Sequence, residues 1–165
     1  MNITNTLDVP DRQAWRAWLE VNHAIEREIW LVYYRKASGI PRIPYNDSVE
    51  EALCFGWIDS TVKKIDQDRF AQRFTPRNPG SAWSEMNKER ARQLLAQGKM
   101  APAGLARLGD LSEVSLVIPP DILLALQADA TVWENFQGFP ASYQRIRVGW
   151  IEVARKRPAV FQQRL

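Results

Sequence analysis

The stretch YNDSVEEALCFGWIDSTVKKIDQDRFAQRFTPR, residues 45–77, contains the signals that decide the fold. Its first part carries apolar residues at helical spacing and reaches Gly56, a residue type that commonly ends helices, so a helix is predicted. Two runs rich in β-branched and aromatic residues follow, at 57–65 and 69–77, around the polar segment DQDR, which is typical of a β-hairpin. A helix that leads directly into a hairpin indicates a unit of the α+β class.

The segments on both sides extend this pattern. Helical spacing is found at 11–26, 84–98, 101–109, 121–139 and 140–158, and a strand-like aromatic run is found at 27–36. Asp8 or Asp11 could cap the first of these helices, and Ser84 could cap the second. The sequence therefore predicts an α+β domain at residues 1–112, in which helices pack on a small antiparallel or mixed sheet. An all-helical segment at residues 113–165 is expected to pack on that domain.

Composition and charge limit the functional classes. The 165 residues carry a formal net charge of +3, with 22 Lys and Arg interleaved with 19 Asp and Glu, so nucleic-acid binding is not favoured. Arg145, Arg147 and Arg164 near the C-terminus could still contact phosphate, although a charged helix end more commonly faces solvent. The single cysteine suits a reducing compartment, and neither a signal-peptide pattern nor an apolar run of about 18 residues is visible. We expect a cytoplasmic protein without a membrane span.

Metal, cofactor and nucleophile chemistry find little support in the sequence. The single histidine, His23, and the single cysteine, Cys54, are far apart and lack the close spacing of metal ligands. Cys54 falls on the inner face of its predicted helix, where a thiol behaves as a small hydrophobic group. The chain also lacks the glycine patterns of nucleotide-binding loops and the G-x-S-x-G elbow. We therefore expect no metal site and no cofactor.

The interval 59–90 is the most promising candidate site. In a strand, Arg73, Thr75 and Arg77 alternate onto one face, and apolar residues take the other. A helix that starts at Ser84 offers free N–H groups that favour an anion, and the arginines add forked donors for carboxylate or phosphate. The expected ligand-binding residues are Tyr45, Trp57, Asp59, Arg73, Thr75, Arg77, Trp83, Ser84, Asn87 and Lys88.

The role of Asp59 depends on the register of the hairpin. A four-residue loop, 66–69, places Asp59 on the phenylalanine-bearing face of the next strand, whereas a three-residue loop, 67–69, sets it opposite Arg77. A slip of one residue exchanges the two faces, so the sequence leaves both registers open. Because a buried acid without a partner is costly, we expect Asp59 to contact an arginine. That contact is either purely structural or part of the site.

Several blocks of the sequence resemble one family of bacterial proteins. This is the YdeI/OmpD-associated, or bacteriocin-protection, family. The blocks of this sequence that resemble it are EIWLVYYRK, YNDSVEEALCFGWIDS, RFTPRNPGSAWSEMNKERARQLLAQGKMAPAGLA and FQGFPASYQRIRVGWIEVARK. The resemblance runs in order from Trp15 to Lys156 and departs at the C-terminus, KRPAVFQQRL. The motif positions are Tyr45, Glu51, Gly56, Trp57, Asp59, Arg73, Pro76, Arg77, Trp83, Asn87 and Arg90. The resemblance implies a link to tolerance of cationic antimicrobial peptides and to envelope stress, and it carries over no catalytic residue.

Three functional hypotheses follow. The first is a cytoplasmic, non-catalytic protein that binds a small anionic ligand or an acidic partner segment through Arg73, Arg77 and the start of the Ser84 helix. In this hypothesis Asp59 orients an arginine. The second is an enzyme that acts on a small anionic substrate with Glu51 or Asp59 as general base. The third is weak nucleic-acid binding through the basic C-terminal helices, which predicts a strong dependence on salt. The oligomeric state stays open in all three.

Overall fold

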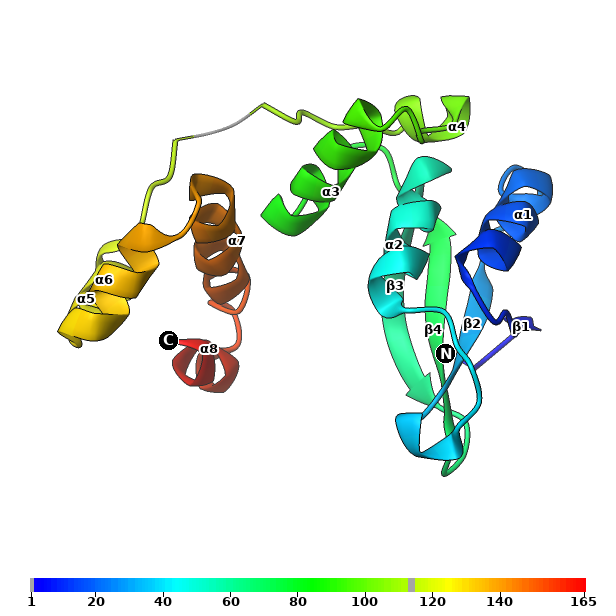
Figure 1. Cartoon of the computed structure of the whole chain (residues 1–165), viewed down its shortest axis with the longest axis horizontal. Coiled ribbons are helices and arrows are strands. Elements are labelled where there is room, and N and C mark those ends of the chain that lie inside the picture. Colours follow the sequence, from blue (N-terminus) through cyan, green and yellow to red (C-terminus); the bar gives the residue numbers. More distant parts are fainter. Residues whose placement is uncertain (1, 113–114) are drawn as a thin grey trace. The chain divides into compact units, whose positions relative to one another are not determined.

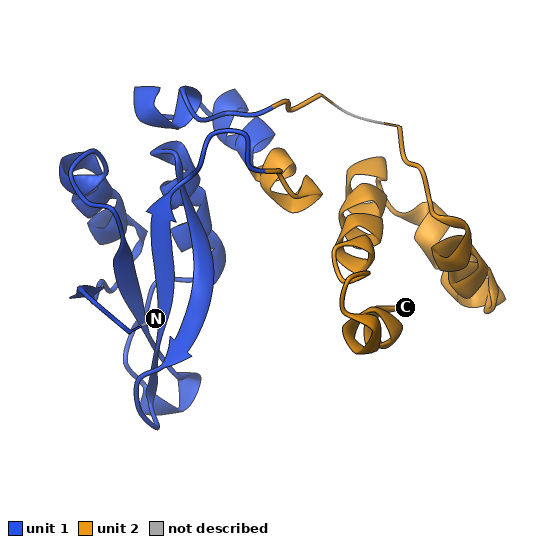
Figure 2. Ribbon diagram, turned by 180° about the vertical axis from the view of Figure 1, so that it is seen from behind, with its two compact units in different colours: residues 1–81, 91–109 blue, residues 82–90, 110–165 orange. Residues whose placement is uncertain are grey.

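The computed structural model describes residues 2–112 and 115–165, which form two compact units (Figures 1 and 2). The first unit comprises Met1–Ser81 and Ala91–Gly109, and the second comprises Ala82–Arg90 and Asp110–Leu165. Helix α3, Glu85–Ala96, is divided between the two units. The expected packing of the C-terminal segment on the first domain stays a prediction, and positions 113 and 114 of that segment lie outside the described residues.

A four-stranded sheet forms the centre of the first unit (Figure 1). The strands lie in the order β1-β2-β4-β3, with β1 parallel to β2 and the other neighbours antiparallel. The elements of this unit are β1 (Thr6–Leu7), α1 (Arg12–Asn22), β2 (Ile29–Tyr34), the 3₁₀ turn η1 (Lys36–Ser38), α2 (Tyr45–Cys54), β3 (Trp57–Lys64), β4 (Arg69–Pro76) and α4 (Pro102–Leu105). This mixed sheet with its helices confirms the predicted α+β class.

Helix α1 packs on the sheet and on α2 through tryptophan. Asp11 caps the helix, because its side chain accepts a hydrogen bond from the backbone N–H of Ala14 at 2.9 Å. Trp15 is fully buried and donates its indole N–H to the carbonyl of Ser48 at 3.0 Å. The centre of its ring lies 5.4 Å from that of Phe74. One of the two expected caps is thereby confirmed, and a single tryptophan joins α1, α2 and β4 in one core.

The β3–β4 hairpin has a register that differs from both of the predicted ones. Lys64 pairs with Phe70 next to the turn, whereas Asp59 pairs with Phe74 further along, so β3 contains one extra residue between Asp59 and Val62. This irregularity is a β-bulge, which shifts the pairing by one residue. Asp59 shares the face of Phe74, as the four-residue loop predicted, but its partner differs for two reasons. The pairing next to the turn is shifted by one residue from that prediction, and the bulge shifts it by one more. The face lies on the side of α1, against whose Trp15 Phe74 packs.

Strand β2 lies inside the sheet, between β1 and β4. All residues from Ile29 to Tyr33 are buried, which matches the continuous apolar run in the sequence. Strand β1 has only two residues, and a strand this short leaves no period in a sequence, so the pattern does not predict it.

Helix α4 lies against the end of α2 with no room for side chains between them. A Cβ atom at Gly104 would lie 2.1 Å from the carbonyl oxygen of Cys54, and one at Gly56 would lie 2.7 Å from Cγ of Arg107. Gly56 also has a φ of 72°, a conformation that glycine adopts without steric cost and that ends helices. The predicted stop of the helix at Gly56 is confirmed.

The helices of the second unit enclose a core of their own (Figure 2). They are α5 (Pro120–Gln127), α6 (Ala130–Gly138), α7 (Ala141–Glu152) and α8 (Pro158–Arg164), together with the start of α3. The buried core residues are Ile122, Phe136, Val148, Ile151, Ala154 and Phe161. The helical spacing at 121–139 is split in two because the Asp129 side chain caps α6 by accepting from the N–H groups of Thr131 and Val132. Over residues 2–112 and 115–165, no helix has the length and apolar character needed to cross a membrane.

Candidate functional site

The residues expected to form the site belong to both units. Those in the first unit are Tyr45, Trp57, Asp59, Arg73, Thr75 and Arg77. Those in the second unit are Trp83, Ser84, Asn87 and Lys88. Each group therefore has to be judged by its own surroundings.

Asp59 makes its contacts with uncharged side chains. Its Oδ2 atom accepts hydrogen bonds from the hydroxyl of Tyr45 at 2.8 Å and from Nε2 of Gln72 at 3.0 Å. The expected contact between Asp59 and an arginine is therefore wrong for the described residues. The physical reason is the register, which places the carboxylate on the face of the buried Gln72.

Arg73 is held by an acid of its own unit. Glu28 Oε2 accepts hydrogen bonds from Nε of Arg73 at 2.7 Å and from its Nη2. Bonds from the hydroxyl of Thr4 and from Arg73 lower the pKa of Glu28. Because this forked contact already uses the donors that a ligand would need, Arg73 stabilises the fold and is a weak candidate for an anion site.

Arg77 and Trp57 are part of the interior. Arg77 is buried; its Nη2 donates to the carbonyl of Ser81 at 2.9 Å, and burial lowers the pKa of its guanidinium. Trp57 is buried and donates its indole N–H to the carbonyl of His23 at 3.1 Å. Thr75 is half-buried and pairs with Ile58 in the hairpin. These residues position the hairpin and the loop that follows it.

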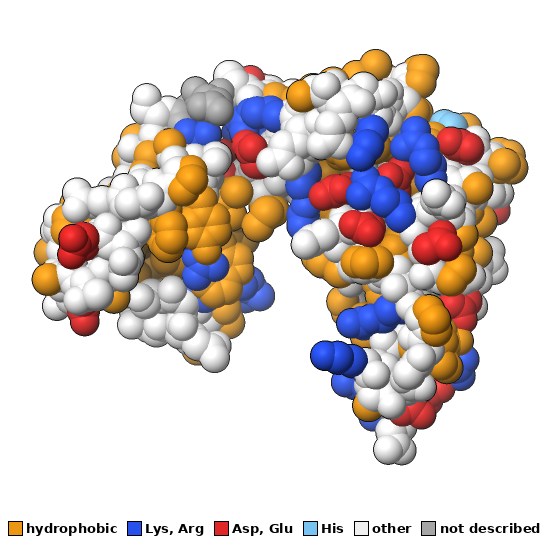
Figure 3. Space-filling model, in the orientation of Figure 1, with side chains coloured by type: hydrophobic (Ala, Val, Ile, Leu, Met, Phe, Trp, Pro, Cys, Tyr) orange, Lys and Arg blue, Asp and Glu red, His pale blue; other side chains and the backbone are white. Residues whose placement is uncertain are grey.

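Glu51 lies in an ion network that the sequence analysis did not anticipate. Its buried carboxylate accepts from Nε of Arg12 at 2.5 Å and from Nη1 of Arg16 at 2.7 Å. Arg12 also contacts Glu50 at 2.8 Å, and Figure 3 shows charges of both signs interleaved over α1 and α2. Burial raises the pKa of the neighbouring Cys54 thiol to about 11. The i,i+4 spacing of the two arginines, opposite an acid on the next helix, is the signal that could have revealed this network.

The start of α3 already has a carboxylate of its own. Ser84 caps the helix, as predicted, because its Oγ accepts from the backbone N–H of Asn87 at 3.3 Å. Glu85 in the first turn pairs with Lys88 at 3.1 Å. Asn87 accepts from Arg90 Nη1 at 2.8 Å, and the half-buried Trp83 directly precedes the cap. An acid in the first turn satisfies the positive potential that was expected to attract a ligand.

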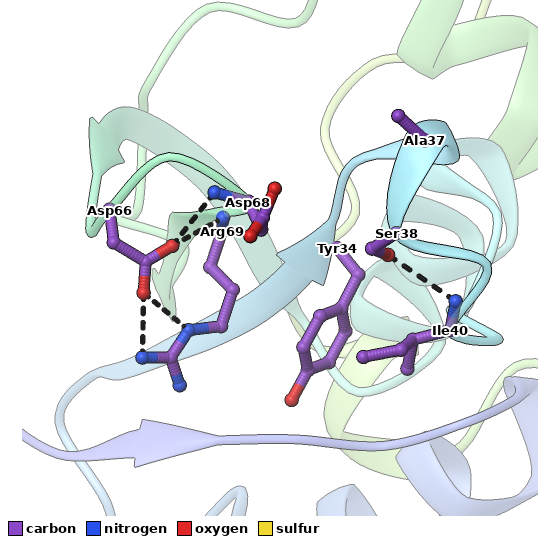
Figure 4. Close-up of a pocket in the computed structure, with 7 residues that line it drawn as sticks. All are labelled: Tyr34, Ala37, Ser38, Ile40, Asp66, Asp68 and Arg69. Atoms are coloured by element: carbon purple, nitrogen blue, oxygen red, sulfur yellow. Dashed lines mark hydrogen bonds and ion pairs between the residues drawn. The ribbon is translucent and has the colours of Figure 1, made fainter.

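The first unit contains a shallow cavity of about 450 Å³ that the sequence did not indicate (Figure 4). It is lined by Tyr34, Ala37, Ser38, Ile40, Asp66, Asp68 and Arg69. Figure 4 shows the ring of Tyr34 between the Asp66–Arg69 pair and the η1 segment. Asp66 accepts from Nε of Arg69 at 2.8 Å, a bond that lowers its pKa, and no described residue donates to the Asp68 carboxylate. Two acids and one base make this lining unfavourable for an anion.

A second cavity, of about 250 Å³, lies within the second unit. Its lining is mostly apolar and consists of Glu85, Ser115, Leu116, Val117, Pro119, Arg145, Val148, Gly149 and Glu152. The buried Arg145 has Glu85 at 3.9 Å, and Glu152 is bound on both oxygens by Arg155. The lining carries two acids and one base, which does not favour an anion.

The exposed side of α7 combines arginine with aromatic rings. Tyr143, Arg147 and Trp150 occupy positions i, i+4 and i+7, which share one face of a helix. The guanidinium carbon of Arg147 lies 5.0 Å from the centre of the Trp150 ring, and that of Arg164 lies 4.1 Å from it. The ring of Phe139 packs edge-on against Tyr143, with centres 4.8 Å apart. We call these five residues the α7 ridge.

Basic residues outnumber acids along the stretch of sequence that carries most of the ridge. Residues 140–165 contain six Lys or Arg and one acid, Glu152, whereas the other 139 residues contain 16 Lys or Arg and 18 acids. In Figure 3, hydrophobic side chains gather over the helices of the second unit, with Lys and Arg side chains among them. The basic residues were expected from the sequence, whereas the aromatic residues at helical spacing between them were not predicted to be part of a site.

Metal binding has no evident donor set in the described part of the chain. No group of three His, Cys, Asp or Glu side chains suited to a metal ion occurs within residues 2–112 and 115–165. His23 bonds through Nδ1 to the carbonyl of Leu19 at 2.7 Å, as expected of a residue that packs near a helix end.

Comparison with known families divides the chain at nearly the same place as the fold. A family model described as a domain of unknown function, DUF8412, matches residues 7–107, more than half of the chain. The chain belongs to this family. The family described as "Bacteriocin-protection, YdeI or OmpD-Associated" matches residues 115–165, so the resemblance seen in the sequence is confirmed for this part. The DUF8412 match covers the hairpin block that carried much of that resemblance. No curated protein and no solved structure matches the chain significantly.

Proposed function

We propose that this chain is a non-catalytic binding protein whose α7 ridge binds an acidic segment of a partner protein. The observation that carries the proposal is the pair of guanidinium groups, on Arg147 and Arg164, that flank the exposed ring of Trp150. The single cysteine supports action in a reducing compartment such as the cytoplasm. The description of the family that matches residues 115–165 supports a role in bacteriocin protection.

The chemistry of the ridge suits carboxylates. A guanidinium presents several N–H donors in a plane, which match the two oxygens of a carboxylate. No hydrogen bond from Arg147 to another described residue is formed, and its ring contact leaves the donors at the edge of the guanidinium.

The contacts of the candidate catalytic groups support a binding role over catalysis. Both carboxylate oxygens of Glu51 are bound by arginines, and burial disfavours the thiolate of Cys54. Asp59 meets one requirement of a general base, because no arginine holds it, but it lines neither of the two cavities described above. A base has to reach the proton that it removes, so the enzyme hypothesis is the weaker one.

A direct test measures the binding of a fluorescein-labelled peptide rich in glutamate by fluorescence anisotropy. We expect the double variant Arg147→Ala/Arg164→Ala to bind at least about tenfold more weakly than the wild type, which corresponds to about 1.4 kcal/mol. The matched control is Arg35→Ala/Lys64→Ala, which removes the same charge from exposed positions of the first unit and should bind like the wild type. Circular dichroism confirms that each variant is folded.

Two results would overturn the proposal. Equal affinity of the wild type and the ridge variant would show that acidic peptides bind elsewhere or only through net charge. Preferential binding of a single-stranded oligonucleotide over the peptide, with a steep dependence on salt, would favour the nucleic-acid alternative. The single variant Arg147→Gln, which keeps the length and polarity of the side chain, serves if the double variant is unstable.

A further inference from the structure

The aromatic end of the α7 ridge has no role in binding a carboxylate. Phe139 and Tyr143 are 43% and 40% exposed, although their rings contact each other. Exposed aromatic rings of this size are enriched at protein interfaces, where they bury a large area with little loss of side-chain freedom. Tyr143 lies on α7 one helical turn before Arg147, and Phe139, which follows α6, packs against it, so the apolar and the cationic parts are neighbours.

The helix fixes the distance between these two parts. Tyr143 and Trp150 are seven residues apart in α7, which corresponds to about 10 Å along the helix axis at a rise of about 1.5 Å per residue. The opposite side of α7 cannot change its position freely, because Val148 and Ile151 are buried in the core of the second unit. The helix therefore holds the apolar pair at one end of the ridge at a fixed separation from the guanidinium groups beside Trp150 at the other end.

We infer that the partner segment is amphipathic and carries a large apolar side chain about 10 Å from its carboxylates, with the apolar group packed on the exposed surface of the Phe139–Tyr143 pair. This inference rests on the proposed function and specifies the partner of the same surface. The apolar contact supplies the affinity of a buried anchor, and the carboxylates on Arg147 and Arg164 set orientation and register. A segment that carries only acidic side chains would contact the two arginines and leave the aromatic pair uncovered.

Two other partners fit the ridge less well. An anionic membrane would favour a helix with a broad apolar face toward the lipid, but the apolar residues Val148 and Ile151 of α7 are buried in the core of the second unit. A single-stranded nucleic acid would need free ring faces for its bases, whereas the Trp150 ring has two guanidinium groups against it.

The test compares two acidic peptides that differ in one residue, a phenylalanine three positions from a Glu-Glu pair or an alanine in its place. In an extended peptide three residues span about 10 Å. We expect the phenylalanine peptide to bind wild-type protein about tenfold more tightly than the alanine peptide. Tyr143→Ala should remove most of this difference between the two peptides. Tyr143→Phe should restore the difference, because the ring is retained.

The outcomes separate this inference from the proposed function. If both peptides bind equally and both are lost in Arg147→Ala/Arg164→Ala, the apolar anchor is wrong and the acidic partner stands. If neither peptide binds, the proposed function fails and the inference fails with it. Binding of the wild type to vesicles of anionic phospholipid, without binding of either peptide, would assign the ridge to a lipid surface and overturn both.

Discussion

Three arginines of the first unit and those of the α7 ridge lie in opposite environments. Arg12 and Arg16 converge on the buried Glu51, and Arg73 is held by Glu28. Arg147, by contrast, rests on the exposed ring of Trp150. A guanidinium paired with a buried acid holds helices and strands together, whereas one on an exposed ring can turn its donors to a partner.

An arginine in the sequence can therefore be structural or available for binding, and the presence of an acid next to it in the fold distinguishes the two roles. The arginines of β4 seemed suited to an anion because they alternate on a strand next to a helix start. The acid that holds Arg73 is Glu28, 45 residues away in the sequence, whereas Arg69 pairs with the nearby Asp66. Substituting first the acids that hold structural arginines and then the arginines of the ridge tests this division, because the first changes should reduce stability and the second should reduce binding.

The largest loss of stability is expected for Glu51→Gln. The change leaves Arg12 and Arg16 without their buried counter-charge, and removing one partner of such a network costs about 3 kcal/mol of unfolding free energy. Urea denaturation followed by circular dichroism measures the loss. Glu50→Gln, at a more exposed position of the same network, should cost less than about 1 kcal/mol. Equal losses for the two variants would mean that burial does not distinguish these acids.

An intermediate loss of stability, which depends on pH, is expected for Glu28→Gln. The folded state lowers the pKa of this carboxyl below its ordinary value of 4.5, so the folded protein prefers the ionised form. Its stabilisation is complete above that value and is lost as the pH falls through the folded pKa. At neutral pH Glu28→Gln should therefore be less stable than the wild type by about 1 kcal/mol. The difference should vanish in acid; a constant difference from pH 7 to pH 3 would argue against ionisation as the cause.

The smallest effect on stability is expected on the ridge. Arg147→Ala removes an exposed contact with the Trp150 ring and should change the unfolding free energy by less than about 0.5 kcal/mol. Arg164→Ala also removes the hydrogen bond from its Nη1 to the carbonyl of Trp150 and should cost somewhat more, up to about 1 kcal/mol. Thermal unfolding compared with the peptide-binding assay reveals whether affinity falls while stability is kept. A loss of stability near that of Glu51→Gln would place these arginines with the structural ones and remove the contrast.

Much of the fold could be predicted from the sequence because its signals are local. The cap at Asp11, the stop at Gly56 and the two strands of the hairpin depend on residues a few positions apart. The two-residue β1 and the short α8 are too brief to leave a period. The bulge in β3 depends on how two strands fit a core and not on the residues at the turn, so no local pattern indicates it.

The candidate site was harder to predict because it depends on tertiary partners. The sequence could not show that Gln72 and Tyr45, and no arginine, would hold Asp59. It also could not show that Arg73 would be bound by Glu28. The ridge could have been predicted in part, because Tyr143, Arg147 and Trp150 follow helical spacing. The sequence did not show which face of α7 is buried, and so did not show that these residues are exposed.

The bulge of β3 has a further consequence for the behaviour of the protein in a crowded cell. Strand β3 is the last of the sheet, and such outer strands can recruit strands of neighbouring chains into aggregates. The extra residue interrupts the regular row of N–H and C=O groups that a foreign strand would need, and Lys63 and Lys64 add charge beside it. The opposite edge, β1, has only two residues to offer. The irregularity that moves Asp59 away from the arginines thus also protects the sheet against unwanted assembly.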